Sequence, residues 1–337
     1  RLKDNMWGYD RHTDQTVNIY SAFLQNEWKN ERWSILVGGR LDKHNMVDNI
    51  IFSPRANLRF NPTQNINLRL SYSSGFRAPQ AFDEDMHIEN VGGTVAMIER
   101  AKDLKEEKSQ SFSVSADMYH RFGAFQTNLL IEGFYTRLTD VFVLGKPYDR
   151  GDGILVKTRS NGPGAKVMGL TLEGKVAYLS ILQIQAGLTL QRSRYDEPHK
   201  WHDDVPAKRT IFRTPNVYGY FTATYIPIKP LSIALSGTYT GSMFVQRMDI
   251  TAKNAAMGDM PERKAEAVKT PKFLDLGVKL AYDFKLYKTV DLQLSGGVQN
   301  ILEAYQKDFD RGANRDSGYI YGPALPRSFF AGVKISY

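Results

Sequence analysis

Alternation of apolar and polar residues recurs along almost the whole chain, and it constrains the fold more than any other feature of the sequence. In residues 170–178, for example, the sequence LTLEGKVAY places Leu, Leu, Val and Tyr on one side and Thr, Glu and Lys on the other. A period of two is typical of β-strands with one apolar and one polar face. We predict an all-β fold of about thirteen antiparallel strands. Their approximate ranges are 16–28, 33–41, 50–60, 66–76, 112–118, 125–144, 154–179 with an interruption at 161–164, 183–191, 212–226, 231–240, 274–284, 290–298 and 329–337.

The connections between these strands alternate in length. Short turns, such as residues 61–65 and 227–230, alternate with long connections, such as those after Leu144, Met248 and Ile301. Transmembrane β-barrels have this asymmetry, because turns on one side of the membrane are short and loops on the other are long. We therefore predict an antiparallel transmembrane barrel, and a large soluble β-sandwich stays open as an alternative.

The composition permits a barrel and excludes several other classes of protein. No run of about eighteen apolar residues is present, so no helix is expected to span a membrane. The mean hydropathy of -0.40 still fits a barrel, because each spanning strand contributes only about five apolar residues. Aromatic residues such as Trp33, Phe60 and Tyr178 lie near strand ends, where two interfacial girdles would place them. The absence of cysteine excludes disulfides, thiolate metal sites and cysteine nucleophiles.

The longest connection, residues 79–107, separates two well-patterned strands. Pro79 ends the first strand, and Phe82, Met86 and Ile88 recur behind it at helical spacing, so we expect a short helix there. A connection of this length between two clear strands is usually functional or disordered.

Two short motifs bracket this connection. The first reads Gly-Phe-Arg-Ala-Pro over residues 75–79, and the second reads Leu-Lys-Glu-Glu-Lys-Ser over residues 104–109. They resemble the paired signatures that bracket one large extracellular loop in the barrels of TonB-dependent outer-membrane receptors. Glu106 stands where that family usually has proline, so the second motif matches the family signature less closely. The positions that carry the resemblance are Phe76, Arg77, Ala78, Pro79, Leu104, Glu107 and Ser109.

The resemblance implies a fold and a mode of action. Family members have a barrel of twenty-two strands filled by an N-terminal plug, and a segment before the plug takes energy from the TonB complex. Extracellular loops and the plug bind a scarce metal chelate such as a ferric siderophore, haem or cobalamin. The resemblance thus places this chain in the outer membrane of a Gram-negative bacterium, as an integral protein without a resident cofactor.

The whole chain, residues 1–337, is expected to be the C-terminal part of such a barrel, with residues 79–107 as its large extracellular loop. Thirteen strands of a presumed twenty-two leave nine strands and the plug outside this sequence. The two edges of the sheet, at residues 16–28 and 327–337, should then not pair with each other. Residues 1–15 are expected to be the tail of an extracellular loop.

The last strand adds a second resemblance. Gly332, Ile335 and the terminal Tyr337 resemble the C-terminal signal by which outer-membrane barrels are recognised for assembly. Phe330 departs from this pattern, because a polar residue is more usual at its position. We expect Tyr337 to be the natural C-terminus.

Candidate ligand-binding residues lie in the long loops. In haem receptors of the resembled family a histidine of the large loop can ligate iron, so His87 is a possible haem ligand, although a surface histidine is the plainer interpretation. Residues 83–85 are all acidic, but three acids on a loop are more often solvated than bound to Ca²⁺. Apart from this role of His87, no metal site is predicted. The candidates are Phe82, His87, Trp201, His202, Tyr319 and Tyr321.

Neither the motifs nor the charge indicates an enzyme or a nucleic-acid binder. No Ser/His/Asp order, phosphate-cradling glycine loop or His-x-x-x-His helix is present, so we expect no catalysis. The net charge of +8 is mild and spread along the chain, whereas nucleic-acid binders concentrate it in one stripe. We interpret it as contact with an anionic surface such as lipopolysaccharide. A passive porin-like channel shares the strand pattern and remains an alternative function.

Overall fold

A computed structural model describes residues 2–6, 11–80, 96–146, 148–151, 155–251, 262–287, 289–311, 315–316, 318–323 and 325–337. Every regular element in these ranges is a β-strand. No helix within them is long and apolar enough to cross a membrane. The elements are β1 (Leu2–Met6), β2 (Arg11–Gln15), β3 (Ile19–Lys29), β4 (Trp33–His44), β5 (Ile51–Thr63), β6 (Ile66–Arg77), β7 (Ala96–Arg100), β8 (Glu107–Phe122), β9 (Phe125–Thr139), β10 (Phe142–Leu144), β11 (Tyr148–Asp149), β12 (Leu155–Asn161), β13 (Ala165–Tyr178), β14 (Leu182–His199), β15 (Lys208–Thr210), β16 (Val217–Ile228), β17 (Leu231–Thr240), β18 (Phe244–Thr251), β19 (Glu262–Lys269), β20 (Phe273–Tyr287), β21 (Val290–Gln299) and β22 (Ser328–Ser336).

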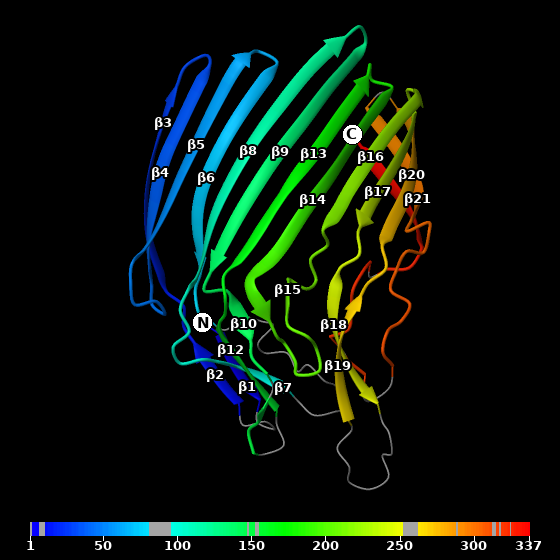
Figure 1. Ribbon diagram of the computed structural model, residues 1–337. Helices are drawn as coiled ribbons and strands as arrows, with labels where there is room; N and C mark the ends of the chain where they lie inside the picture. The colour runs from blue at the N-terminus through cyan, green and yellow to red at the C-terminus, as the bar shows by residue number, and fades with distance from the viewer. Residues whose placement is uncertain are drawn as a thin grey trace.

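One large antiparallel sheet forms the wall of the molecule (Figure 1). Its main path joins thirteen strands in the order β22-β21-β20-β17-β16-β14-β13-β9-β8-β6-β5-β4-β3, and the short β15 adds to β14. Consecutive wall strands are neighbours throughout, as expected for a chain of hairpins. The predicted barrel wall and its thirteen strands are confirmed. The alternative of two packed sheets in a soluble sandwich is wrong, because the thirteen strands belong to a single sheet.

The two ends of the wall differ in construction. At the turn end, the upper end in Figure 1, hairpins close through short connections such as residues 123–124 and 179–181. At the loop end, long connections carry three smaller sheets made of β1 and β2, of β7, β10, β11 and β12, and of β18 and β19. The predicted separation of short turns from long loops is therefore confirmed.

The two faces of the wall differ in polarity, and β8 illustrates the difference. Its even positions include Phe112 and Val114, which are 46% and 60% exposed although they are apolar. Its odd positions include Ser111, Ser113 and Ser115, which are less exposed. An exposed apolar face suits lipid, and the serine-rich face suits the interior of a barrel. We call these the outer and the inner face.

Two rows of aromatic side chains border the apolar band of the outer face. Near the turn end, Phe122, Phe125 and Tyr178 lie in register, with ring centroids 5.3 Å and 4.7 Å apart. Ten residues further along β8 and β9, Phe112 and Tyr135 form the second row. Ten residues at about 3.3 Å each, tilted by about 40°, rise about 25 Å. This height matches the hydrocarbon layer that an outer-membrane barrel crosses.

The predicted single strand 125–144 is wrong. It ends as β9 at Thr139, and the chain re-forms as β10 in a different sheet after Asp140, whose φ is 55°. The opposite strand breaks at the same level, because β12 ends at Asn161 and β13 starts at Ala165. The predicted interruption at 161–164 thus divides two sheets, and it is more than a bulge within one ladder.

Two further expectations need correction. The ninth wall strand begins at Val217 instead of residue 212, because Arg213 has a φ of 57° and Pro215 cannot donate to a ladder. Residues 2–6 and 11–15, expected to be the tail of an extracellular loop, pair as β1 with β2, and their place in such a loop stays a prediction. The fold is also not wholly antiparallel, since β7 and β12 pair in parallel.

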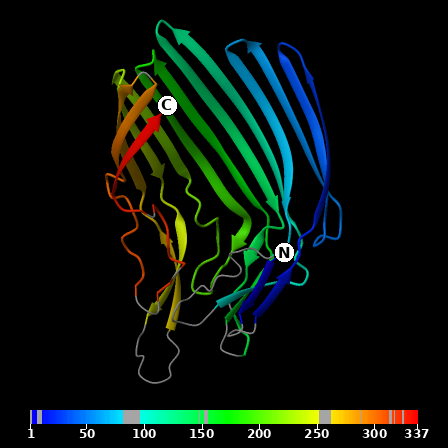
Figure 2. The ribbon, with the colours of Figure 1, turned by 180° about the vertical axis from the view of Figure 1, so that it is seen from behind.

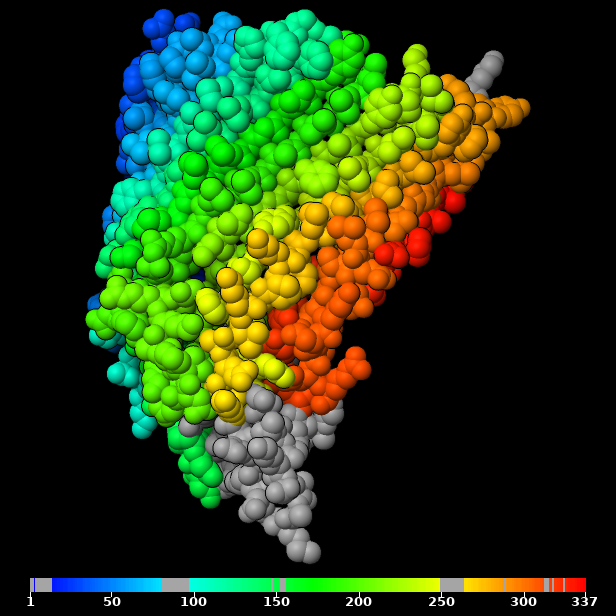
Figure 3. Space-filling model, turned by 45° about the vertical axis from the view of Figure 1, so that its right-hand side comes forward, coloured from blue at the N-terminus to red at the C-terminus, as the bar shows by residue number. Residues whose placement is uncertain are grey.

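The wall is open along one side. In the described residues, β3 pairs only with β4 and β22 pairs only with β21, so the expected lack of pairing between the two edges is confirmed. Figure 2 shows these two strands at opposite sides of the trough that the sheet forms. Figure 3 shows how obliquely the strands cross the molecule, as the tilt of barrel strands requires.

Candidate functional site

The two bracketing motifs meet in space at the loop end of β6 and β8. Gly75, Phe76 and Arg77 are the register partners of Ser109, Lys108 and Glu107. The motif residues therefore define one short section of ladder, where the large loop leaves the wall and returns to it.

Two contacts tie this ladder to the small sheet beyond it. The Oε2 atom of Glu107 accepts a hydrogen bond of 2.9 Å from the backbone N–H of Phe142 in β10. The guanidinium carbon of Arg77 lies 5.6 Å from the centre of the Phe142 ring, within cation–π range. Both motifs thus hold the start of the β10 segment.

The second half of the large loop is fastened to the same segment. The Asn161 side chain accepts a hydrogen bond from the N–H of Lys105 and donates to the carbonyls of Lys105 and Asp140. Arg100 donates to the carbonyl of Pro79 at 2.9 Å. The amide of Asn161 therefore holds the segment around Leu104 in place. Because it also binds the carbonyl of Asp140, the same side chain connects the two points at which β9 and β13 leave the wall.

A pocket of about 230 Å³ lies among the loops beyond this ladder. Its aromatic lining comes from β10, the end of β14 and the connection to β16. Lys208 and Arg213 supply two cations, and none of the residues that line the pocket is acidic. Such a lining suits an anionic ligand with aromatic or apolar parts. The lining residues are Phe142, Val143, Leu144, Tyr195, His199, Trp201, Lys208, Thr210, Ile211, Phe212, Arg213 and Gln246.

Trp201 is the predicted site residue that lines this pocket. Its ring packs edge-on against Phe212, with centroids 6.4 Å apart. Its Nε1 atom is buried, and none of the described residues offers it a hydrogen-bond partner. A buried N–H without an acceptor is uncommon in folded proteins, so this atom is available to an acceptor group of a ligand or to water.

His202 is adjacent to Trp201 and does not line the pocket. Its Nδ1 atom accepts a hydrogen bond of 3.3 Å from the backbone N–H of Asp204. Asp204 in turn accepts from the backbone N–H of Ala265 in β19 at 3.1 Å. His202 therefore helps to connect the loop to the β18–β19 hairpin.

Tyr319 and Tyr321 are brought together, but they are buried, at 2% and 6% exposed. Their hydroxyls donate to the two carboxylate oxygens of Asp308, at 2.9 Å and 2.6 Å. The rings pack with Val245 and Phe273 into a small apolar core. The two tyrosines therefore hold the last long loop together, and their contact with a ligand stays a prediction.

The pKa values of this cluster follow from its geometry. Burial raises the pKa of the Asp308 carboxyl, but the hydrogen bonds from Tyr321 and Tyr319 outweigh it and hold that pKa below its ordinary value. Burial, together with donation to Asp308, raises the pKa of both tyrosine hydroxyls. Asp308 is therefore a stable anion at neutral pH, and both tyrosines are protonated donors.

Two arginines attach this loop to its neighbours. Arg213 donates to the carbonyls of Ile320, at 2.7 Å, and of Gly318. Arg247 of β18 forms an ion pair of 2.9 Å with Asp310, and its guanidinium carbon lies 5.1 Å from the centre of the Tyr319 ring. Arg213 also lines the pocket, so the order of the last loop and the shape of the pocket depend on the same side chain.

The remaining predicted residues are placed as follows. Phe82, His87, the expected short helix and the acidic residues 83–85 lie outside the described residues. In the part of the chain that is described, no three His, Asp or Glu side chains gather in a way that could hold a metal ion. On β22, Gly332 pairs with Ser295 and Ile335 with Leu292, and Tyr337 follows the strand.

Phe330, the exception in the C-terminal pattern, has a local explanation. It lies on the inner face, opposite Gly297 of β21. A Cβ atom on Gly297 would come within 2.5 Å of the Phe330 ring. The glycine therefore leaves the space that the ring occupies.

Sequence reasoning missed most of the pocket and the carboxylate at the centre of the tyrosine cluster. Lys208, Phe212 and Arg213 stand close together in the sequence, and this interleaving of cations and aromatic residues was a usable signal. Asp308 gave none, because its partners are eleven and thirteen residues away in an irregular loop.

Comparisons with known proteins agree with this architecture. Residues 3–301 match the protein family described as TonB dependent receptor-like, beta-barrel. A mutant of the ferric enterobactin receptor PfeA from Pseudomonas aeruginosa has a similar fold, with a TM-score of 0.66 and 17% identity over 97% of this chain and 46% of that one. Comparison with functionally curated proteins finds no match.

Two further solved structures are similar. The siderophore receptor PirA from Acinetobacter baumannii has a TM-score of 0.65 and 15% identity, over 95% of this chain and 46% of that one. The FrpB iron transporter from Neisseria meningitidis has a TM-score of 0.62 and 17% identity, over 95% and 45%. The chain thus spans less than half the length of these proteins. Because the family match extends over most of its residues, the chain belongs to the β-barrel family of TonB-dependent receptors.

Proposed function

We propose that this chain is the C-terminal part of an outer-membrane receptor that takes up a ferric siderophore with energy from TonB. The pocket lined by Trp201, Lys208 and Arg213 is the observation that carries the proposal. Two cations, several aromatic rings and no lining carboxylate suit a chelate that is both anionic and aromatic. The three similar structures above carry names of ferric enterobactin, siderophore and iron transport, which supports the same class of ligand.

In this proposal the ligand is held without covalent chemistry. An anionic chelate lies against Lys208 and Arg213, aromatic parts stack on Trp201 and Phe212, and an oxygen atom accepts from the Trp201 indole N–H. The plug and the remaining strands of the barrel, which are not in this sequence, would complete the binding site and the route inward. Catalysis and a resident cofactor are not part of the proposal.

Haem is the second candidate because a histidine lines the pocket. His199, and not His87, occupies that position among the described residues. A neutral imidazole is a common iron ligand. We expect the siderophore to bind more tightly, because its negative charge matches Lys208 and Arg213 better than the mostly apolar ring of haem does.

Binding to cells that make the intact receptor tests the proposal. We expect Trp201→Ala and Lys208→Gln each to weaken binding of a ferric tris-catecholate about tenfold, and uptake to require an energised TonB complex. His202→Ala and Lys200→Gln change the same loop outside the pocket, so they should leave affinity within about twofold.

Three outcomes would contradict the proposal. If the pocket variants and the control variants lose the same amount of affinity, the pocket is not part of the binding site. Uptake without TonB would favour the porin-like channel. A Soret shift that disappears in His199→Ala, together with unchanged catecholate binding in Trp201→Ala, would favour haem.

A further inference from the structure

Arg213 is held by a part of the chain more than one hundred residues away. Its Nη1 atom donates to the carbonyl oxygen of Ile320 at 2.7 Å, and its Nη2 atom donates to the carbonyl oxygen of Gly318. Both carbonyls belong to the last long loop, between β21 and β22. A guanidinium has further N–H groups, and these suit an anion in the pocket that Arg213 lines. The last loop therefore orients a cation of the pocket.

The backbone of Arg213 is also held by another element. Its φ is 57°, in the left-handed region that residues other than glycine rarely adopt. Such a conformation persists where the surrounding structure holds it. The N–H of Arg213 donates to the carbonyl of Phe244, the first residue of β18, at 2.8 Å. β18 therefore positions the backbone of Arg213, and the last loop positions its side chain.

The same strand, β18, separates the pocket from the small apolar core of the last loop. We call this core the tyrosine core, and its buried members are Val245, Phe273, Tyr319 and Tyr321. Successive side chains of a strand point to opposite sides. On one side of β18, Gln246 lines the pocket and the centre of the Phe244 ring lies 4.2 Å from Nζ of Lys208. On the other side, Val245 belongs to the tyrosine core and Arg247 lies over the Tyr319 ring. Both cations of the pocket are thus supported by elements that pack on the tyrosine core.

The carbonyl of Ile320 is fixed by its two neighbours in the sequence. Ile320 stands between Tyr319 and Tyr321, whose hydroxyls donate to the two carboxylate oxygens of Asp308. Both tyrosine side chains are buried, so the peptide between them has little freedom to move. If the tyrosines shift, the carbonyl that holds Arg213 therefore shifts with them.

We propose that the tyrosine core is a positioning support for the two pocket cations, so that residues outside the pocket lining set its affinity for an anionic chelate. The inference rests on the chelate pocket proposed above and adds Tyr319, Tyr321 and Asp308 to it as positioning residues. A cation that is already oriented binds an anion more tightly, because less conformational freedom is lost on binding. The coupling is reciprocal, so a bound anion stabilises the last loop to the same extent.

Equilibrium binding of a radiolabelled ferric tris-catecholate to membranes that carry the intact receptor tests the coupling. We expect Arg213→Gln to weaken binding about tenfold, and Tyr321→Phe to weaken it about fourfold. In the Arg213→Gln background, Tyr321→Phe should cause no further loss, because the side chain through which it acts is already absent. A structural role of Tyr321 that does not pass through Arg213 would instead give the same loss in both backgrounds.

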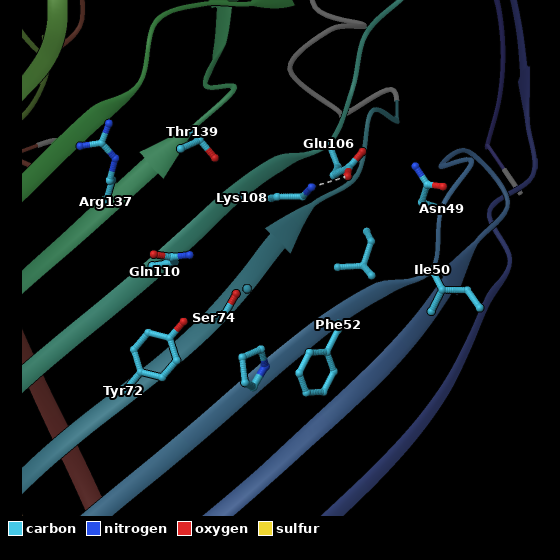
Figure 4. A pocket seen from close by; sticks show the side chains of 13 residues that line it. Asn49, Ile50, Phe52, Tyr72, Ser74, Glu106, Lys108, Gln110, Arg137 and Thr139 are labelled. Carbon is cyan, nitrogen blue, oxygen red and sulfur yellow. Dashed lines mark ion pairs between the residues drawn. The ribbon is translucent and has the colours of Figure 1, made fainter.

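Two control variants separate the coupling from general effects. Tyr305→Phe removes a hydroxyl of the same loop for which no hydrogen bond occurs among the described residues. Lys108→Gln removes a cation from a separate groove at the loop end of the wall, which Figure 4 shows with the ion pair of 3.0 Å between Lys108 and Glu106. Both variants should keep the affinity for the chelate within about twofold.

Hydrogen exchange of the unaltered receptor tests the reciprocal effect. Saturating ferric tris-catecholate should slow exchange several-fold in peptides covering residues 304–323. This protection should disappear in Arg213→Gln, because the contact between the pocket and the loop is then lost. If Tyr321→Phe does not fold, Tyr319→Phe removes the other hydrogen bond to Asp308 and should give the same pattern of affinities.

The outcomes distinguish a failure of this inference from a failure of the proposed function. Unchanged affinity in Arg213→Gln would remove the chelate pocket and the coupling together. A loss in Arg213→Gln without any loss in Tyr321→Phe would overturn the coupling alone. A last loop that the bound chelate does not protect, or additive losses in the double variant, would also overturn the coupling alone.

Discussion

The hydroxyl of Tyr321 donates a hydrogen bond of 2.6 Å to Oδ1 of Asp308, and this bond closes the last long loop on itself. Tyr319 occupies the other carboxylate oxygen at 2.9 Å. Gln306 completes the arrangement, because its side chain donates to the carbonyl of Tyr319 and accepts from the N–H of Tyr321. The loop between β21 and β22 therefore has a polar core of its own.

Removal of either tyrosine hydroxyl should loosen this loop. Tyr321→Phe leaves a buried carboxylate oxygen without its donor, and a lost hydrogen bond to a charged group costs about 1.5–3 kcal/mol. We expect faster hydrogen exchange in peptides covering 304–323. Tyr305→Phe is the control, since no hydrogen bond of its hydroxyl occurs in the described loop. Unchanged exchange in Tyr321→Phe would contradict a structural role for the bond.

The same cluster predicts how the loop responds to pH. The folded pKa of Asp308 is lowered, so its contribution to stability is present above its unfolded pKa of about 3.9 and is lost as the pH falls through the folded value. The tyrosine pKa values are raised, so their contribution is present below about pH 10 and is lost at higher pH.

Loop protection should therefore be constant between about pH 5 and pH 9, and it should fall below about pH 4. Hydrogen exchange corrected for intrinsic rates measures it. Asp308→Asn should remove the acid limb of this profile, and a profile identical to that of the unaltered chain would show that another group titrates.

The contact between Glu107 and the N–H of Phe142 predicts the effect of a substitution in the second motif. Glu107→Ala removes the acceptor of that N–H, and we expect a loss of about 1–3 kcal/mol in the local stability of β10. Proteolysis between residues 139 and 162 should become faster. Glu106→Ala is the neighbouring control, because its partner Lys108 is 53% exposed and their ion pair should contribute less than about 1 kcal/mol.

The assignment of the two faces predicts opposite responses to arginine. Leu172 lies on the outer face near the middle of the apolar band, so Leu172→Arg should destabilise the folded wall in lipid by about 2–4 kcal/mol. Gln185→Arg on the inner face lies within reach of Glu173 and should change stability by less than about 1 kcal/mol. Urea titration in lipid vesicles compares them, and equal losses would contradict the two faces.

The wall was predictable because each strand carries its own signal. The period of two in residues 170–178 and the short turn after Tyr178 depend only on neighbours in the sequence, and β13 and β14 lie where this pattern places them. The break at residues 161–164 was visible through its glycines. The matching break at Asp140 was not visible in the sequence. Asp140 has a positive φ, but it is neither a glycine nor a proline, the residues that usually mark such a break.

The structures of the loops could not be predicted from the sequence, for a different reason. Arg213 reaches carbonyls more than one hundred residues away, and Arg247 reaches Asp310 across sixty-three residues. No local period or turn residue encodes such partners. Trp201 was predicted because an aromatic ring in a polar loop is conspicuous, whereas Lys208 acquires its place in the pocket only when β10 and β18 pack nearby.

The paired breaks in the wall hairpin also bear on how such a protein can change. Leu138 and Ala165 are register partners in the wall, and Phe142 and Asn161 are partners in the small sheet just beyond. The chain therefore leaves and rejoins the wall at one place, and the ladder between β9 and β13 reaches this place without a shift of register. A different segment inserted between Thr139 and Ala165 leaves every wall pairing in register. Evolution can therefore exchange the whole segment at this hairpin and so change which ligand the receptor recognises. The strands that face the membrane keep their sequence and their pairing.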